Sequence, residues 1–257
     1  MSSGGSLSFD RAAEYYDATR GRSDEIERSV ARLAEILGGR DRCLEVGVGT
    51  GRVALPLHQK GIDLVGIDIS ARMMAKMREK TSGRHPFPLV QGDATRIPFR
   101  AHSFDAAYSI WVLHLIPAWE RVLDELLRVL RPGSPIVVTL GGKFGSGPWE
   151  EIASHFREIT GAAPPGAGAM TEIDAAMDAR GYRGTSLEPL MTTVEVSAED
   201  ILHRLEANQH SFTWVLDDAT LSRGVAETKK WAEERYGDLT VPLRNEFGAE
   251  WRLYELP

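Results

Sequence analysis

The feature that most constrains the fold is a regular alternation of short apolar runs and helix-like segments between residues 43 and 140. Five apolar runs are predicted to be strands: 43–46, 64–67, 88–90, 104–110 and 136–140. The segments 52–60, 71–80 and 118–130 have helical spacing, and Ser70 is placed to cap the second of them. Short connections in such an alternation require right-handed crossovers, so we predict an α/β fold with a mostly parallel sheet covered on both faces.

The residues on either side of this region add helices to the predicted sheet. Residues 8–36 have helical spacing and end at Gly38-Gly39, while 187–196 and 247–256 are predicted to be a sixth and a seventh strand. The segment between these two strands, helical in pattern from 198 to 236, is too long for a plain connection. We therefore expect an N-terminal helical cap (1–37), a core (38–196), a helical lid insertion (197–245) and a last core strand (246–257).

A glycine-rich loop follows the first predicted strand in the segment LEVGVGTGR (44–52). Glycines at 47, 49 and 51 allow a tight turn and a close approach of the backbone to a ligand. The helix that follows offers unpaired N–H groups to an anionic group. Asp68 ends the second strand, where a carboxylate can accept both ribose hydroxyls, although it could also serve only as a helix cap. Asp93 ends the third strand, where it can accept from a donor such as an adenine amino group, although it could also serve only as a helix cap.

The spacing of these glycines distinguishes between nucleotide ligands. A dinucleotide fingerprint is G-x-G-x-x-G, whereas this chain has G-x-G-x-G, with Arg52 at the position of the third fingerprint glycine. Glu45 precedes the loop, and an acid there disfavours a pyrophosphate and suits a ligand that bears an ammonium group. The pattern therefore disfavours an NAD(P)-dependent oxidoreductase, which would also need a hydride-site motif that the sequence lacks.

Composition narrows the class of protein further. The 257 residues carry a formal net charge of −7, which does not favour DNA or RNA as a partner. The single cysteine, Cys43, cannot form an internal disulfide or a cysteine metal cluster, and we predict no metal site. The sequence shows neither a secretion signal nor an apolar run long enough to span a membrane, so we expect a cytoplasmic protein.

Taken in order, several segments resemble the class I S-adenosylmethionine-dependent methyltransferases, in the small-molecule branch labelled type 11. They are LEVGVGTGR (44–52), GIDIS (66–70), QGDATRIPF (91–99), SFDAAYSIWVLHLI (103–116) and LLRVLRPGSPIVV (126–138). The segment 16–20 also resembles one that closes over the cofactor, and 211–216 resembles the helical C-terminal part of some bacterial members. The resemblance implies a Rossmann-like seven-stranded sheet in the order 3-2-1-4-5-7-6, with an antiparallel last strand.

The resemblance also implies a cofactor, S-adenosylmethionine, with S-adenosylhomocysteine as product, and a role for individual residues. Asp68 would hold the ribose, Asp93 the adenine amino group, and Glu45 the amino group of the methionine part. Tyr16 and Arg20 would approach the methionine carboxylate; Tyr15 could take the place of Tyr16. The remaining expected cofactor contacts are Gly47, Val48, Gly49, Thr50, Gly51, Ile69, Met73, Gly92, Ala94, Ser109 and His114.

Methyl transfer from a sulfonium mainly needs alignment, so a general base is optional and depends on the acceptor. His114 is the first candidate for such a base and His210 the second, although a lone histidine beside apolar residues is more often structural.

We expect a small-molecule acceptor, because the N/D-P-P-aromatic motif of base-amino methyltransferases is absent after the fourth strand. Aromatic residues that could line its pocket are Trp111, Phe144, Trp149, Phe212 and Trp214. The same motifs would fit a non-catalytic S-adenosylmethionine-binding protein, and they predict no particular oligomeric state.

Overall fold

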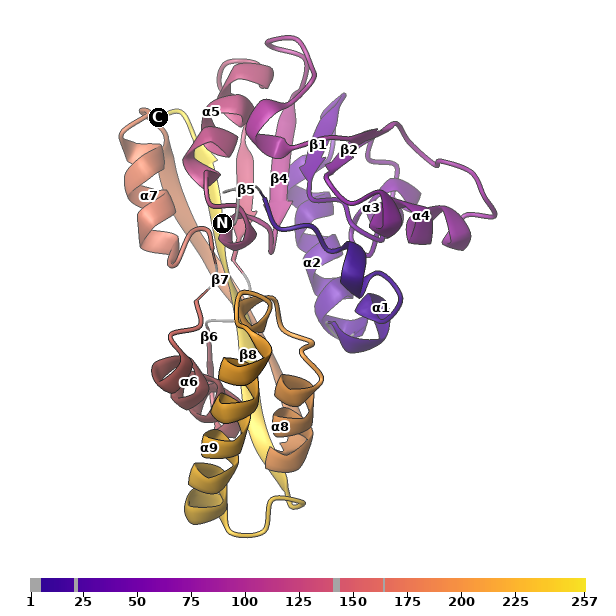
Figure 1. Cartoon of the computed structure of the whole chain (residues 1–257). Coiled ribbons are helices and arrows are strands. Elements are labelled where there is room, and N and C mark those ends of the chain that lie inside the picture. Colours follow the sequence, from indigo (N-terminus) through magenta and orange to yellow (C-terminus); the bar gives the residue numbers. More distant parts are fainter. Residues whose placement is uncertain (1–5, 21–22, 141–143, 164) are drawn as a thin grey trace.

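The protein is described by a computed structural model that covers residues 6–20, 23–140, 144–163 and 165–257 (Figure 1). Its central sheet contains the five predicted parallel strands: β1 (Cys43–Val46), β2 (Leu64–Asp68), β3 (Leu89–Gln91), β4 (Ala106–Ile110) and β5 (Ile136–Thr139). Two long strands, β7 (Arg183–Ser197) and β8 (Pro242–Glu255), and the short β6 (Phe144–Ser146) complete it.

The strand order is β3-β2-β1-β4-β5-β8, with β7 on the outer edge of β8. β1 pairs in parallel with both β2 and β4, and β8 runs antiparallel to β5, β6 and β7. The predicted order 3-2-1-4-5-7-6 is therefore confirmed, with β8 as the seventh strand and β7 as the sixth. Val46 lies level with Ile67 and Ser109, so the carboxyl ends of the central strands meet at one edge.

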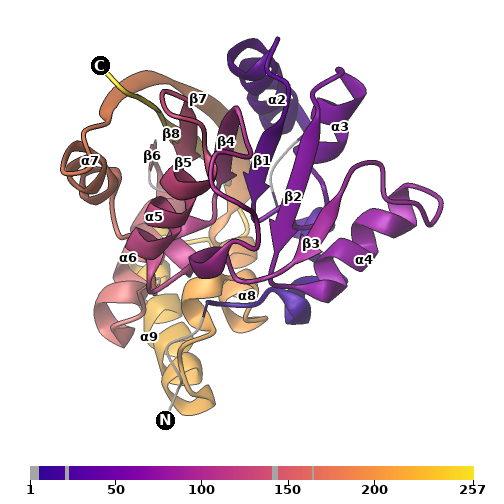
Figure 2. The same ribbon diagram turned by 90° about the horizontal axis from the view of Figure 1, so that it is seen from above.

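Helices cover both faces of this sheet, as Figure 2 shows from above. On one face pack α2 (Ser23–Leu37), α3 (Ala54–Gln59) and α4 (Ala71–Lys80). On the other pack α5 (Trp119–Val129) and α7 (Met170–Asp178). Ser70 accepts a hydrogen bond from the Met73 N–H and so caps α4, as predicted.

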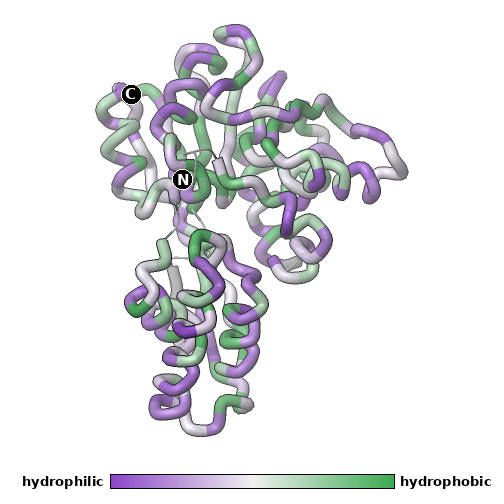
Figure 3. Tube along the Cα trace, viewed as in Figure 1, coloured by the Kyte–Doolittle hydropathy of each residue, from purple (hydrophilic) through white to green (hydrophobic). Residues whose placement is uncertain are grey.

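A second lobe surrounds the part of the β7–β8 hairpin that extends beyond the core sheet (Figure 1). It consists of α6 (Pro148–Thr160), α8 (Ala198–Glu206) and α9 (Asp218–Tyr236), which share one apolar core around Phe156, Leu205 and Ala232. In Figure 3 its helices alternate between hydrophilic and hydrophobic colour along their length, as expected when one side of each helix is buried.

Several bounds differ from the sequence prediction. Helix α6 was not predicted and lies within the range assigned to the core, and β8 begins at Pro242 and not at 246. The expected helix over 8–36 is divided into a 3₁₀ turn (Asp10–Ala12), α1 (Tyr16–Thr19) and α2, because Arg20 adopts an extended backbone and ends α1. The helical pattern over 198–236 is broken by a 3₁₀ turn at Ser211–Thr213.

In the described part of the chain, no helix combines the length and apolar character needed to cross a membrane.

Candidate active site

The glycine loop turns sharply from β1 toward α3 at the carboxyl edge of the sheet. Gly47 has a φ of +79°, and a Cβ atom there would lie 2.2 Å from Cγ2 of Val112. Gly49 has a φ of +54°, but a Cβ atom there would make only ordinary contacts, with the Cε atom of Met73 at 3.6 Å and with the Gly47 carbonyl oxygen at 3.9 Å. Glycine at 47 is therefore required by packing, whereas glycine at 49 keeps space open beside the loop.

Asp68 lies across from this loop at the end of β2. Its Oδ2 accepts a hydrogen bond from the Gly49 N–H, and its Oδ1 accepts one from the Ser70 N–H, both at 2.8 Å. Burial raises the pKa of the Asp68 carboxyl, while these two N–H groups lower it. Each carboxylate oxygen has a second lone pair, so Asp68 can still accept two hydroxyl groups, as a ribose would require.

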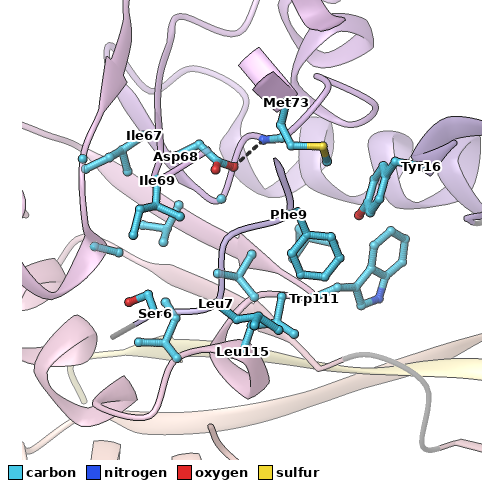
Figure 4. A pocket seen from close by; sticks show the side chains of 18 residues that line it. Ser6, Leu7, Phe9, Tyr16, Ile67, Asp68, Ile69, Met73, Trp111 and Leu115 are labelled. Carbon is cyan, nitrogen blue, oxygen red and sulfur yellow. Dashed lines mark hydrogen bonds between the residues drawn. The ribbon is translucent and has the colours of Figure 1, made fainter. Parts of the chain in front are cut away.

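A cavity of about 80 Å³ opens between Asp68, the glycine loop and the N-terminal segment (Figure 4). The sheet edge contributes Val46, Gly47, Gly49, Ile67, Asp68, Ile69, Met73, Gly92, Ala94, Ile110, Trp111, Val112, Leu115 and Ile116. The N-terminal segment contributes Ser6, Leu7, Phe9 and Tyr16. Ligand sites commonly enclose roughly 300–1,000 Å³, so in this conformation the N-terminal segment restricts the space.

We call residues 6–20 the N-terminal strap, because polar contacts hold this segment across the edge of the sheet. Near its start, the Ser6 hydroxyl donates to Oδ1 of Asp93 at 3.1 Å, and the Leu7 N–H donates to the Leu115 carbonyl oxygen at 3.2 Å. Further along, Ser70 Oγ donates to Asp10 at 2.6 Å. These contacts place the strap over the residues predicted to bind the cofactor.

The far end of the strap is fixed to the glycine loop. The Thr50 hydroxyl donates to Oδ1 of Asp17 at 2.5 Å, and Lys80 Nζ pairs with Oδ2 of Asp17 at 2.5 Å. Lys80 Nζ also donates to the Thr50 carbonyl oxygen at 2.8 Å. The predicted cofactor contact Thr50 therefore anchors the strap.

Of the residues predicted to contact a cofactor, those lining the cavity are Tyr16, Gly47, Gly49, Asp68, Ile69, Met73, Gly92 and Ala94. Tyr16, and not Tyr15, is the tyrosine that faces it. Val48 lies instead in the apolar core beneath α3 and α4, and Gly51 packs against Met77 and Leu55.

Three further predicted contacts, Glu45, Asp93 and Ser109, do not line the cavity. Glu45 accepts a hydrogen bond from the Tyr108 hydroxyl at 2.8 Å, and burial raises the pKa of its carboxyl well above the ordinary value. Asp93 caps the short turn that follows β3 by accepting from the Thr95 N–H. Ser109 is fully buried in β4, and its Oγ has no hydrogen-bond partner in the described structure.

The two candidate bases and Arg20 are not among the residues that line the cavity. His114 is in a 3₁₀ turn after β4, and its carbonyl oxygen accepts from the Gly166 N–H. His210 lies between α8 and α9, where its ring stacks on Phe212 with centroids 5.2 Å apart. The Arg20 guanidinium donates to the Gln209 carbonyl oxygen at 2.5 Å and so joins the strap to the lid.

Of the five aromatic residues suggested for an acceptor pocket, Trp111 lines the cavity. It has a φ of +59°, an uncommon backbone conformation for a bulky residue, directly after β4. Trp149, Phe212 and Trp214 belong to the second lobe, which we also call the lid side of the cavity. The side chain of Phe144 lies outside the described part of the structure.

Sequence reasoning missed Ser6, Leu7 and Phe9, which carry no local motif and reach the cavity only through the path of the strap. Val112, Leu115 and Ile116 were also missed, although they lie in the quoted segment 103–116, directly after β4. Their place at the carboxyl end of a central strand is the signal that could have identified them.

Comparison with known proteins identifies the family of the core. Residues 44–138 match the family model described as a methyltransferase domain. A phosphatidylethanolamine N-methyltransferase of Cereibacter sphaeroides is 38% identical over 48% of this chain and 61% of its own length. A demethylmenaquinone methyltransferase of Beutenbergia cavernae is 35% identical over 55% of this chain and 58% of its own length. The chain thus spans about three fifths of these relatives.

The solved structures show that this fold also occurs in proteins named for other reactions. The [4+2]-cyclase SpnF superposes with a TM-score of 0.54 at 21% identity, over 99% of this chain and 87% of that protein. This similarity shows the fold alone. The strand order, the glycine loop and the family match agree, so residues 44–138 of this chain form a methyltransferase domain, and the chain is similar to S-adenosylmethionine-dependent methyltransferases of the class I fold.

Proposed function

We propose that this protein is an S-adenosylmethionine-dependent methyltransferase that transfers a methyl group to an O, N, S or C atom of a small molecule. The observation that carries the proposal is the arrangement of Asp68 and Gly49 at the cavity. Asp68 has acceptor capacity left after binding two backbone N–H groups, and Gly49 leaves the adjacent space open. When bound, S-adenosylmethionine supplies a methyl group activated on a sulfonium.

In this proposal each wall of the cavity contacts one part of the cofactor. Asp68 accepts the ribose hydroxyls, and Ile69 and Ala94 lie beside the adenine. Tyr16 faces the methionine part, and the glycine loop passes close to it. Asp93 could accept from the adenine amino group through Oδ2, because its contacts with Ser6 and Thr95 are made by Oδ1.

Opening of the N-terminal strap is also part of this proposal. A cavity of about 80 Å³ is too small for a nucleoside ligand together with an acceptor, and the strap supplies four of its lining residues. We propose that residues 6–20 move outward to admit ligands and close again to exclude water.

The chemical contribution of the protein is alignment. Holding the acceptor atom in line with the methyl group can supply roughly 7–11 kcal/mol of the barrier. Of the two candidate bases, we favour His114 as the general base. Burial, together with the positive charges of Arg20 and Arg204, lowers the pKa of His210 to about 3, which makes it a weak base near neutral pH.

The identity of the acceptor is tested by turnover. The two relatives are named for different acceptors, phosphatidylethanolamine and demethylmenaquinone, so a screen should include amines, phenols and quinols. Purified protein is incubated with S-adenosylmethionine labelled in its methyl group and with each acceptor, and label transfer is measured. Transfer that is lost in Asp68→Ala supports the proposal. Tight cofactor binding with no transfer to any acceptor class would favour the alternative, a non-catalytic S-adenosylmethionine-binding protein.

A further inference from the structure

Three aromatic side chains line one side of the cavity: Phe9, Tyr16 and Trp111. Phe9 and Tyr16 belong to the N-terminal strap, whereas Trp111 directly follows β4. In Figure 4 the three rings lie close to one another, and Asp68 and Ile69 lie on the opposite side of the pocket. We call Phe9, Tyr16 and Trp111 the aromatic wall of the cavity.

Packing and backbone geometry hold these rings in position. Phe9 meets Tyr16 edge to face, with ring centroids 5.7 Å apart, and contacts Trp214 of the second lobe, with centroids 4.7 Å apart. Trp111 has a φ of +59°, and its N–H donates to the Thr139 carbonyl oxygen at 2.9 Å. Such a conformation is strained for a bulky residue and persists only where the surrounding structure enforces it. The position of the aromatic wall is therefore set by the fold.

The cavity offers a ligand few charged groups. Of the described residues that line it, Asp68 is the only carboxylate, and none is a lysine, an arginine or a histidine. Both oxygens of Asp68 already accept backbone N–H groups, from Gly49 and Ser70. The proposed function assigns the remaining lone pairs of Asp68 to the ribose. A cation on the aromatic side of the cavity therefore has ring faces, and not a carboxylate, as its neighbours.

A ring face can stabilise such a cation, because the π electrons make the face of the ring negative. The attraction acts within about 6 Å of the ring centroid and is stronger where water is excluded. In a cavity of about 80 Å³, a group beside one of these rings also lies near the others. The cofactor of the proposed function carries a cation of this kind, the sulfonium, directly beside the methyl group that is transferred.

We propose, on the basis of the proposed function, that Phe9, Tyr16 and Trp111 bind the sulfonium of S-adenosylmethionine and so distinguish it from S-adenosylhomocysteine. In methyl transfer a lone pair of the acceptor forms the new bond to the methyl carbon, and the electron pair of the broken S–C bond stays on sulfur. The product is a neutral thioether, which a ring face attracts less than a sulfonium. Because two of the three rings belong to the strap, the substrate form of the cofactor holds the strap closed more firmly than the product form.

The proposal is tested by the ratio of two affinities, measured by calorimetric titration with S-adenosylmethionine and with S-adenosylhomocysteine. The two ligands differ only in the methyl group and the charge that it gives to sulfur. In Trp111→Leu, S-adenosylmethionine should bind about 5- to 30-fold more weakly, while the affinity for S-adenosylhomocysteine changes less than about threefold. Trp111→Phe keeps a ring face and should retain most of the original ratio, whereas a purely apolar contact would be served equally well by leucine.

A second measurement follows the strap. Hydrogen exchange of backbone N–H groups in residues 6–20 should be slower with saturating S-adenosylmethionine than with saturating S-adenosylhomocysteine. Phe9→Leu should reduce this difference, since it removes one of the two strap rings. The control is Trp231→Leu, the same change as Trp111→Leu at a residue of the second lobe that stacks on His155 and does not line the cavity. It should alter neither the affinity ratio nor the exchange of the strap.

Two different failures can be told apart. If S-adenosylhomocysteine does not bind, the proposed function fails first. If it binds, but Trp111→Leu weakens both ligands equally or neither of them, the aromatic wall does not select the sulfonium, and the inference is overturned while the proposed function stands. Equal exchange of the strap with both ligands would overturn the link between the sulfonium and closure of the strap.

Discussion

The two sides of the cavity differ in how completely their polar groups are satisfied. On the sheet side, both oxygens of Asp68 accept backbone N–H groups at 2.8 Å, and the loop geometry is fixed by close packing at Gly47. On the lid side, the buried Nε2 of His210 has no partner in the described structure. We propose that the sheet side, through Asp68 and the glycine loop, binds the cofactor, and that the lid side contributes to selection of the acceptor.

The largest expected effect tests the packing of the sheet side. In Gly47→Ala, the added Cβ would lie 2.2 Å from Val112 in a left-handed backbone conformation. Left-handed strain and overpacking together should lower the free energy of unfolding by about 2–5 kcal/mol, measured by chemical denaturation. Gly49→Ala is the matched control, because it shares the left-handed backbone conformation but its Cβ makes only ordinary contacts, at 3.6 Å or more. It should lose far less stability and should weaken cofactor binding. Equal destabilisation by both changes would contradict this account of the loop.

The next-largest expected effect concerns the affinity of the sheet side for the cofactor. Asp68→Ala removes the acceptor of the ribose hydroxyls, so binding of S-adenosylhomocysteine should weaken by about 1–3 kcal/mol, or roughly 5–150-fold. Asp68→Asn keeps the shape and one acceptor oxygen and should lose less. Calorimetric titration of each variant measures the change. Unchanged affinity in Asp68→Ala would remove Asp68 from the cofactor site.

A pH effect tests the lid side. The pKa of His210 is lowered from 6.5 to about 3 by burial and by Arg20 and Arg204, so below pH 6.5 the unfolded chain binds a proton that the folded chain does not. Stability attributable to His210 is therefore complete above pH 6.5 and decreases as pH falls from 6.5 toward 3, by at most about 1.4 kcal/mol per pH unit. His210→Phe keeps an aromatic ring beside Phe212 and should show a shallower decrease in this range. The same pH dependence in both proteins would mean that His210 is not buried in its neutral form.

The smallest effect concerns the strap that joins the two sides. Asp17→Asn weakens the contact with Lys80, and both side chains are more than a third exposed, so the stability change should be below about 1 kcal/mol. Because the strap restricts the cavity, we expect faster association of S-adenosylhomocysteine in stopped-flow measurements. Asp63→Asn is the control, because Asp63 is an exposed acid directly before β2. Slower association in Asp17→Asn would show that the strap assists binding instead of restricting entry.

The contrast between the sheet side and the lid side also explains which parts of the fold and the site could be predicted from the sequence. Strands β1 to β5 and helix α4 follow from local signals, such as the Ser70 cap, and the glycine loop and Asp68 lie where the motif indicates. Helix α6 was missed because the regular strand–helix alternation ends near residue 141, although Pro148 at its start and Gly161 in a left-handed conformation at its end are helix signals.

Contacts between distant segments could not be predicted in this way. The link from Arg20 to Gln209 joins residues 189 positions apart, and nothing local to Glu45 indicates that its carboxyl pairs with Tyr108. Local patterns specify elements and the loops at strand ends, but the strap and the lid depend on tertiary packing.

The central claim is that the carboxyl edge of the sheet binds S-adenosylmethionine through the glycine loop and Asp68. Isothermal titration calorimetry of the purified protein with S-adenosylmethionine, S-adenosylhomocysteine and NAD tests it most directly. We predict binding of the first two in the micromolar range, as is common for enzyme ligands, and no binding of NAD. Binding of NAD alone, or binding of none of the three, would contradict the claim.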